Sequence, residues 1–276
     1  MNGIVYKITC LTNLHVGNGE SNFDIIDNAV EKDPVTQLPT INSSGVKGAL
    51  RQYFTQYLSE NRDEIKLVLS NNRMFKADKN TVESLITSIF GSDQKTSQKD
   101  KKKSIPGKVK FYQADLLARP ARASKGDKTH YMVASEETIG IFNLKAGIFG
   151  VDRINGVTSS DDNIGVEGVS HSGVKNIALV DNKTIILDDK TLCDLPLPVL
   201  ARNQLDDGIS KNLWYEQIVP HKSIFTFAVS SDDKDVLDAF AKILGEQAYV
   251  QFGGNATIGY GLCKVERIKK TEAANE

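Results

Sequence analysis

Residues 14–51, LHVGNGESNFDIIDNAVEKDPVTQLPTINSSGVKGALR, carry the chain from a strand through a glycine-broken loop into a helix. Just before them, residues 3–12 alternate between apolar and polar side chains, which predicts the strand. Residues 13–42 have no helical period and contain two glycines and two prolines, so we expect a long loop. From Ser44 onward apolar residues recur at helical spacing, with Ser43 or Ser44 expected as the cap.

The predicted elements at the far end of the chain have the same order. Further helices are expected at 81–90 and 232–247, and further strands at 108–117, 177–187, 223–229, 249–252 and 262–268. A hairpin about Asp181-Asn182 is the alternative for 177–187. A strand, helix and strand at each end favour an α+β fold of the ferredoxin-like, RRM-type kind. We expect one domain over 1–276, with its core at about 1–92 and 220–270. A lysine-rich linker at 93–107 and insertions at about 108–219, including an exposed excursion at 150–175, would interrupt that core.

Composition excludes several classes of protein. The chain has 276 residues, 40% of them hydrophobic and 25% charged, which is ordinary for a soluble globular protein. We find no membrane-spanning run and no secretion signal, and the three isolated cysteines suggest neither a disulfide framework nor a zinc site. We therefore expect a cytoplasmic protein with no membrane partner.

The charge balance also limits the function. A net charge of −1 argues against a free-standing, non-specific nucleic-acid binder, yet it allows a subunit with one basic face. Between residues 93 and 110 there are seven lysines and two aspartates. We interpret this run as a solvated linker, with a phosphate contact as the alternative.

The start of the helix at 44–51 is a candidate anion site. A helix N-terminus presents free N–H groups and the positive end of the helix dipole, which favour a phosphate group. Lys47 and Arg51 are four residues apart and so share one face, and Ser44 precedes them. An ordinary surface helix that happens to carry two basic residues is the competing interpretation.

The glycine-rich stretch 253–261, GGNATIGYG, is a second candidate for binding a ribose-phosphate backbone. Four glycines in nine residues leave N–H groups unobstructed, and Gly253, Gly254, Thr257 and Gly259 are the candidate contacts. The stretch has neither the Walker pattern nor the dinucleotide-binding pattern. A tight, bulged turn with no ligand is the alternative.

The loop before the helix also carries carboxylates that suit RNA cleavage. They are Asp24, Asp27, Glu31 and Asp33. RNA supplies its own nucleophile, the 2′-hydroxyl, so a single carboxylate can act as a base or hold a divalent metal. A turn-forming role for Asp27 and an orienting role for His15 are the alternatives from chemistry alone. No G-x-S-x-G motif is present, which argues against serine hydrolases of that type.

The spacing of these residues closely resembles that of the RAMP superfamily of CRISPR proteins. The motifs that carry the resemblance are His15-x-Gly17-x-Gly19, Ile26-Asp27-Asn28, Asp33-Pro34-x-Thr36-x-Leu38-Pro39 and Ser44-x-x-Lys47-Gly48-x-x-Arg51. The stretch 253–261 is similar to the glycine-rich loop of that superfamily. Within it, residues 195–203, 212–220 and 111–122 are most similar to the repeated backbone subunit of type III-B (Cmr) effector complexes.

The resemblance implies an RRM-type ferredoxin core with inserted fingers and thumb. Members of the family stack along a guide crRNA, with other copies and other RAMP subunits, and each copy cuts the paired target RNA at regular intervals. Cutting in the family needs a divalent metal, Mg or Mn here, and one loop aspartate, whose position Asp27 occupies. The implied products are a 2′,3′-cyclic phosphate and a 5′-hydroxyl.

The resemblance also assigns expected roles to the other candidates. Lys47, Arg51 and the 253–261 loop become guide-backbone contacts, and His15, Tyr215 and Glu216 become candidates near the cut phosphate. Relatives commonly carry glycine where this chain has Asp24, which is either a further metal ligand or incidental. With 7% aromatic residues and no RNP signature, we expect contacts to the RNA backbone and shape to dominate over base stacking.

Three other functions compete with this one. A purely structural RNA-binding subunit would leave cutting to another protein, and the position of Asp27 argues against it. A guide-processing ribonuclease would use an acid–base histidine, for which His15 is the candidate. A small-molecule-binding or protein-binding α+β domain would show no RNA binding at all.

Overall fold

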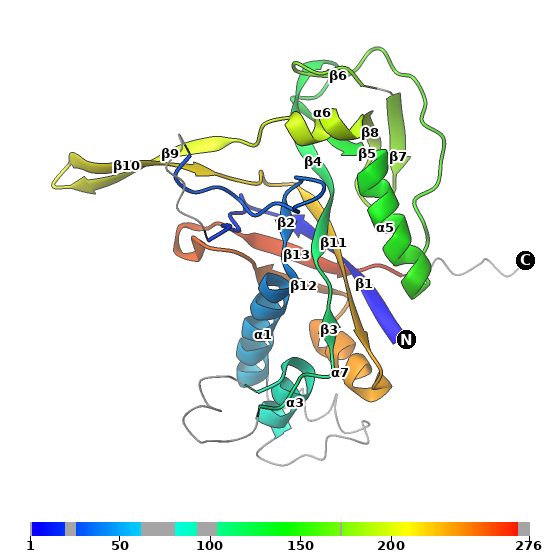
Figure 1. Cartoon of the computed structure of the whole chain (residues 1–276), viewed down its shortest axis with the longest axis vertical. Coiled ribbons are helices and arrows are strands. Elements are labelled where there is room, and N and C mark those ends of the chain that lie inside the picture. Colours follow the sequence, from blue (N-terminus) through cyan, green and yellow to red (C-terminus); the bar gives the residue numbers. More distant parts are fainter. Residues whose placement is uncertain (1, 20–25, 62–80, 93–103, 172, 270–276) are drawn as a thin grey trace, which may run out of the picture.

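The core of the protein is an antiparallel sheet built around β1 (Asn2–Cys10), as seen in a computed structural model that describes residues 2–19, 26–61, 81–92, 104–171 and 173–269 (Figure 1). Four strands lie in the order β13 (Leu262–Arg267), β1, β11 (Ile224–Ser231) and β4 (Ala114–Lys125), and β12 (Gln247–Gln251) extends the sheet beyond β13. Helix α1 (Ser43–Glu60) follows β1 and α7 (Lys234–Leu244) follows β11. This order is that of a ferredoxin-like core, which confirms the predicted fold class.

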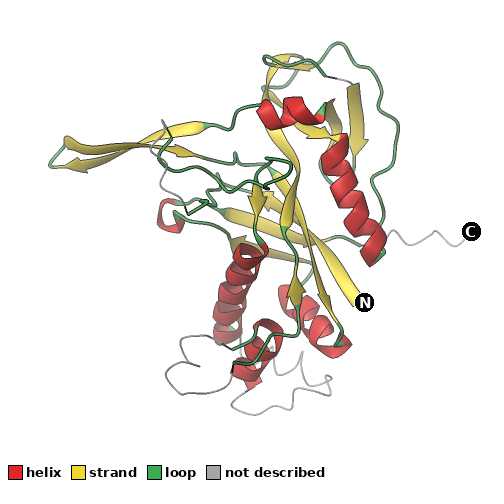
Figure 2. Cartoon of the chain, in the orientation of Figure 1, coloured by secondary structure: helices red, strands yellow, loops and turns green. Residues whose placement is uncertain are grey.

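One face of the core sheet is covered by α1, α7 and α3 (Thr81–Phe90), which gather at one end of the molecule (Figure 2). Alternate side chains of β1, among them Tyr6 and Ile8, point to this side and are fully buried. Phe54 of α1 stacks on Phe240 of α7 with ring centroids 5.0 Å apart. Each such side chain contributes roughly 1.5–3 kcal/mol by leaving water, so this layer is the main source of stability.

The opposite face of the sheet is covered by α5 (Glu136–Phe149), a helix that the sequence analysis did not predict. Phe142 of α5 packs in one buried cluster with Val5 of β1 and Ala228 of β11. The approach is so close at Gly3 that a Cβ atom there would lie 2.1 Å from the Phe149 ring. An RRM-type sheet usually offers this face to bases. Here the inserted helix occupies much of it.

Four details differ from the sequence-based expectations. Strand β3 (Lys110–Phe111) and the first part of β4 pair with β11, so the core includes residues that we had assigned to the insertion at 108–219. The loop at 13–42 is tied down by short β-bridges, and β2 (Thr40–Ile41) at its end pairs with β4. The residue before α1 is Asn42, so both serines lie inside its first turn. Residues 177–187 form only part of a hairpin that turns at 178–180.

The insertion forms a second layer at the other end of the molecule. Its elements are β5 (His130–Ser135), β6 (Gly165–Val166), β7 (Gly173–Ile177), β8 (Asp181–Leu187) and α6 (Asp189–Asp194). Strand β4 joins this layer to the core because its first part pairs with β11 and its later part with β5 and β6. Most of the lysine-rich linker, 93–103, lies outside the described residues.

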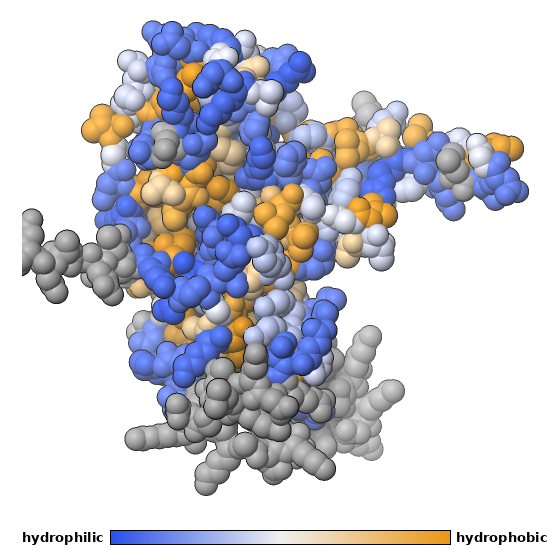
Figure 3. All heavy atoms as spheres, turned by 180° about the vertical axis from the view of Figure 1, so that it is seen from behind, coloured by the Kyte–Doolittle hydropathy of each residue, from blue (hydrophilic) through white to orange (hydrophobic). Residues whose placement is uncertain are grey.

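A long hairpin, β9 (Val199–Asp206) and β10 (Ile209–Gln217), projects away from the body (Figure 1). From behind, the hairpin shows hydrophobic and hydrophilic side chains side by side (Figure 3), and Ile209 and Leu213 are 67% and 54% exposed. None of the described helices is both long and apolar enough to cross a bilayer.

Candidate functional site

The base of the projecting hairpin is where the predicted catalytic loop meets β10. The backbone N–H of Tyr215 donates a hydrogen bond of 2.8 Å to Oδ2 of Asp27. The next residues pair as a β-bridge between Asn28 and Glu216, and the N–H of Gln217 donates to the Asn28 carbonyl at 2.9 Å. Asp27 remains exposed. The hairpin therefore fixes this carboxylate while leaving it open to solvent.

The other described carboxylates of the loop have structural partners. Glu31 accepts a hydrogen bond of 3.0 Å from the Asn42 side chain. Asp33 accepts bonds from the N–H groups of Val35 and Thr36 at 3.0 and 2.9 Å and closes the turn after it. Partial burial acts to raise the pKa of Asp33, but these hydrogen bonds and one from Gln113 outweigh it, so the pKa is lowered.

Asp27 differs from these carboxylates in having an uncommitted oxygen. Its Oδ1 makes no hydrogen bond or ion pair within the part of the chain that the structure describes. Asp24, the other candidate metal ligand, lies outside that part. Of the described loop carboxylates, Asp27 is the one placed to contact a ligand.

Behind Asp27 lies a buried polar cluster centred on Glu216, which is 3% exposed. Its Oε2 accepts from Nη1 of Arg202 at 3.0 Å, and its Oε1 accepts from Nδ2 of Asn255 at 2.6 Å. The Arg202 guanidinium also lies 5.5 Å from the centre of the Tyr260 ring. This Glu216 cluster joins three separate segments: the hairpin, the glycine-rich loop and the loop at His15.

His15 belongs to the interior side of this cluster. It is 9% exposed, its Nδ1 lies 2.8 Å from the Gln217 carbonyl, and its Nε2 lies 3.8 Å from Oε1 of Glu216. Because a carbonyl only accepts, Nδ1 carries the proton in this contact. The structure therefore places His15 and Glu216, both predicted near the cut phosphate, as supports for the site. Tyr215, at 40% exposed, lies on its surface.

In the glycine-rich loop, some of the N–H groups that we expected to be unobstructed are used in hydrogen bonds within the protein. The N–H of Gly254 donates to the His15 carbonyl at 2.9 Å, and that of Gly259 to the Ala256 carbonyl at 3.0 Å. Gly261 donates to the Asn13 carbonyl at 2.7 Å. These bonds are those of a tight turn, the competing interpretation, and the role of Gly253, Gly254, Thr257 and Gly259 in RNA binding stays a prediction. Thr257 is exposed on the outside of the turn, on the short 3-10 helix η1 (Ala256–Ile258).

Alanine substitutions can distinguish the glycines of this loop that have a close steric neighbour from those that have only a left-handed backbone. Gly253 has φ +69° and a Cβ there would lie 2.3 Å from the His15 carbonyl oxygen, whereas Gly259 has φ +83° and open space around it. We expect Gly259→Ala to lower the free energy of unfolding by about 1–2 kcal/mol, from backbone strain alone. Gly253→Ala adds the steric overlap and should cost about 2–5 kcal/mol. Equal urea midpoints for the two variants would contradict this assignment.

The first turn of α1 keeps the features that suit a phosphate group. No side chain caps it, it contains no acidic residue, and Ser43, Ser44 and Gly45 are exposed. Lys47 and Arg51 are half-buried on the same side, and neither makes an ion pair with any residue that the structure describes. Arg51 lines a shallow groove along the helix together with Gly48, Gln52 and Thr55.

The donor set for a metal ion is small. No group of three or more histidine, cysteine, aspartate or glutamate side chains converges among the described residues. Mg²⁺ in nucleotide-processing sites is often held by one or two carboxylates together with substrate phosphates. The exposed Asp27 carboxylate fits that mode, in which RNA completes the site, and does not fit a preformed protein cage.

Comparison with known proteins shows the family of this chain. The family model of the RAMP superfamily matches residues 7–264. The chain belongs to the RAMP superfamily. This confirms the resemblance seen in the sequence motifs.

Two RAMP relatives are similar in sequence. The CRISPR system Cmr endoribonuclease Cmr4 of Pyrococcus furiosus is 23% identical, and the match covers 96% of this chain and 95% of the Cmr4 chain. The CRISPR system Cms endoribonuclease Csm3 of Enterococcus italicus is 33% identical over 33% of this chain and 38% of its own.

Solved RAMP structures have the same fold. A subunit of the type III-B Cmr-beta complex bound to cognate target RNA aligns with a TM-score of 0.72 and 19% identity, over 97% of both chains. Oligomeric Cmr4 from Pyrococcus furiosus aligns with a TM-score of 0.63 and 19% identity, over 97% of this chain and 98% of that one.

Proposed function

We propose that this protein is the guide-RNA-binding backbone subunit of a type III-B CRISPR effector complex and the endoribonuclease that cleaves the paired target RNA at regular intervals in the cytoplasm. The observation that carries the proposal is the exposed Asp27 carboxylate, held by the Tyr215 N–H at the base of the projecting hairpin. The similarity to Cmr4 over nearly the full length supports it.

Asp27 would act on the RNA 2′-hydroxyl. Its Oδ2 is held by the backbone, which leaves Oδ1 to orient the hydroxyl and accept its proton. The deprotonated oxygen then attacks the adjacent phosphate and expels the 5′-oxygen, which takes a proton from solvent water, so that the products are a 2′,3′-cyclic phosphate and a 5′-hydroxyl. Asp27 would be the residue that holds a divalent metal ion, and such an ion would supply charge neutralisation at the phosphate.

The buried Glu216 cluster would keep this carboxylate in place. Glu216 fixes the hairpin base through Arg202 and the glycine-rich loop through Asn255. Because Tyr215 is the residue before Glu216, its N–H can hold Asp27 only while β10 is anchored. In this proposal His15, Arg202 and Asn255 are positioning residues.

The start of α1 would bind the guide backbone through Lys47 and Arg51. We expect Lys47→Ala or Arg51→Ala to weaken binding of a guide RNA several-fold. Each lost phosphate contact should reduce the slope of log affinity against log salt by about 0.7. Filter binding between 50 and 300 mM KCl measures both quantities.

The matched control for these variants is Lys242→Ala, which removes an exposed lysine from the last turn of α7. It should leave both the affinity and the salt dependence unchanged. Equal salt slopes for all three variants would mean that α1 does not contact the RNA backbone.

The overall proposal is tested by reconstituting the effector complex with this chain and a labelled target RNA. Cuts at regular intervals that disappear with EDTA and return with Mg²⁺ or Mn²⁺ are expected. An intact target in the presence of metal would refute the nuclease assignment. Cuts that persist in EDTA would refute the metal requirement alone.

A structural RNA-binding subunit without catalytic activity is the second candidate. The inward placement of His15 and Glu216 favours it, because the described residues then offer Asp27 no acid–base partner beside it. The same burial counts against a guide-processing ribonuclease that uses His15. The two candidates are separated by measuring cleavage in complexes that differ only in this subunit, with either the wild-type chain or its Asp27→Ala variant. Loss of cleavage in the variant favours the nuclease, and unchanged cleavage favours the structural subunit.

A further inference from the structure

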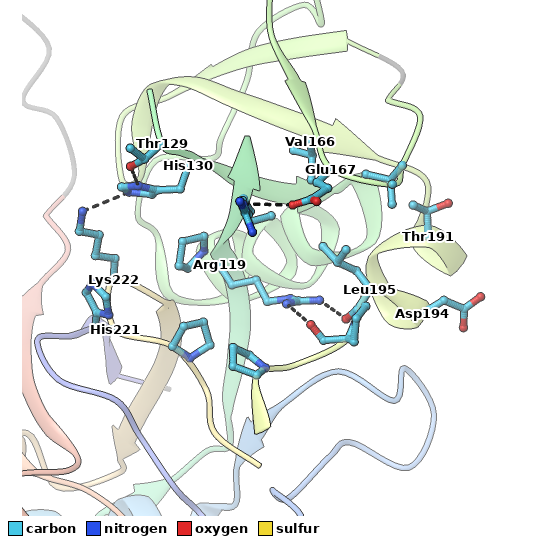
Figure 4. Close-up of a pocket in the computed structure, with 18 of the residues that line it drawn as sticks. Arg119, Thr129, His130, Val166, Glu167, Thr191, Asp194, Leu195, His221 and Lys222 are labelled. Atoms are coloured by element: carbon cyan, nitrogen blue, oxygen red, sulfur yellow. Dashed lines mark hydrogen bonds and ion pairs between the residues drawn. The ribbon is translucent and has the colours of Figure 1, made fainter. Parts of the chain in front are cut away.

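A large cavity opens between the insertion and the core, and no residue of the Glu216 cluster lines it (Figure 4). Its volume is about 980 Å³, and its walls come from β4, from α6 with the chain that leads into β9, and from the turn at 220–222. Neither the catalytic loop nor the start of α1 contributes to it. A cavity of this size is large enough for a nucleotide.

Arg119 supplies a buried positive charge to the wall of this cavity. The residue is 3% exposed, and its guanidinium donates to the carbonyls of Leu192, Leu195 and Pro196, while its Nε has no hydrogen-bond partner. No carboxylate forms an ion pair with it within the described part of the chain. Burial lowers the pKa of Arg119 to about 10, so it stays charged at neutral pH. Among the described residues, its guanidinium therefore contacts carbonyl dipoles rather than a carboxylate.

A second cationic group faces the cavity from the 220–222 turn. Lys222 has φ +72°, a left-handed conformation that is uncommon outside glycine and occurs at functional sites. Its Nζ lies 3.1 Å from Nε2 of His130, which accepts this bond in the neutral ring form (Figure 4). His221 also lines the cavity. Burial, and then the charges of Lys222 and His221, lower the pKa of His130.

The acidic groups around the cavity do not neutralise these cations. Glu167 is paired with Arg122 at 3.2 Å, and both side chains are largely exposed. Asp194 lines the opposite side, at the end of α6. Within the ranges that the structure describes, Arg119 and Lys222 are therefore two cations facing a common space with one unpaired carboxylate, Asp194, an excess of positive charge that favours an anion.

We propose that this cavity binds a phosphate-bearing nucleotide, with its phosphate beside the Lys222 ammonium group and with Arg119 adding positive charge from behind. Pro120, Pro196, Pro198 and Pro220 would form the apolar walls for the sugar and base. The nucleotide is either a free mononucleotide or a residue of an RNA strand that passes the hairpin base. The alternative in which the nucleotide belongs to an RNA strand rests on the proposed function.

The test uses the full-length chain and two probes, AMP and hexauridylate RNA, each followed by isothermal titration calorimetry. Lys222→Met keeps the aliphatic stem and removes the charge, and we expect it to weaken binding about tenfold, ~1.4 kcal/mol. Glu167→Gln removes a negative charge from the rim and should tighten binding. Lys234→Met, on the exposed surface of α7, is the control that should change nothing.

The outcomes distinguish the two sources of the phosphate. If the substitutions change the affinity for AMP as expected, the ligand is a free nucleotide. If they change the affinity for hexauridylate alone, the ligand is part of an RNA strand. If neither probe binds, or if Lys222→Met and Lys234→Met bind alike, the proposal is wrong. Asp27→Ala should leave both titrations unchanged, so failure of this site and failure of the nuclease assignment are separable.

Discussion

Asp27→Ala is expected to abolish cutting of the target RNA by the reconstituted complex, with a fall in rate of about 10²–10⁴-fold from loss of the carboxylate. Guide and target binding should persist, because the backbone contacts proposed at α1 involve other residues. Single-turnover cleavage of a labelled target, together with a binding assay on the same preparation, measures the two effects separately.

Two further variants make this result specific to the carboxylate charge. Asp27→Asn can still accept the hydrogen bond from Tyr215 but loses its charge, so it should be as inactive as the alanine variant. Asp162→Ala removes an exposed carboxylate from the insertion and should cut normally. Cutting at the wild-type rate by Asp27→Asn would show that the charge has no role.

Glu216→Ala is expected to have the largest effect on stability. It removes the acceptor for both Arg202 and Asn255 in a buried setting and leaves the arginine without its partner. Breaking such a pair from one side typically costs about 3–5 kcal/mol. Urea unfolding should show this loss, and cutting should fall as well because Tyr215 no longer positions Asp27.

The control is Glu216→Gln, which keeps the shape and part of the hydrogen bonding and should lose clearly less stability. A double-mutant cycle of Glu216→Leu with Arg202→Met isolates the interaction between the two side chains. A coupling energy near zero would mean that the cluster is held by packing, and the positioning role assigned to Glu216 would then fail.

Strand β1 and helices α1 and α7 were predicted because apolar side chains recur in them at periods of two and 3.6 residues. Strand β11 was predicted although it is buried along its whole length. Helix α5 carries apolar residues on several sides, including Leu144 and Ile148 at 65% and 59% exposure, and shows no clear period. The hairpin was not predicted because most of its β10 residues are exposed and so give no alternation of buried and exposed positions.

Some residues of the candidate site could be recognised from the sequence and others could not. Asp27, Lys47 and Arg51 are recognisable because their motifs are local in the sequence. Arg202 and Asn255 act through Glu216, from 14 and 39 residues away, so local spacing gives no sign of their role. One signal was present in the sequence: asparagine beside two glycines suggests a left-handed turn, and Asn255 has φ +61°.

Because α5 covers the second face of the sheet, the residues that stabilise the fold are different from the residues that can contact a ligand. With helices against both faces of the core sheet, the residues that hold the protein together are different from those in the loops and hairpin that meet solvent. Evolution can then alter the outer residues with little penalty to the scaffold. The chain shares the fold of a Cmr-beta subunit, with a TM-score of 0.72, at only 19% identity. The division between inner and outer residues also makes the scaffold a tolerant starting point for engineering new loops.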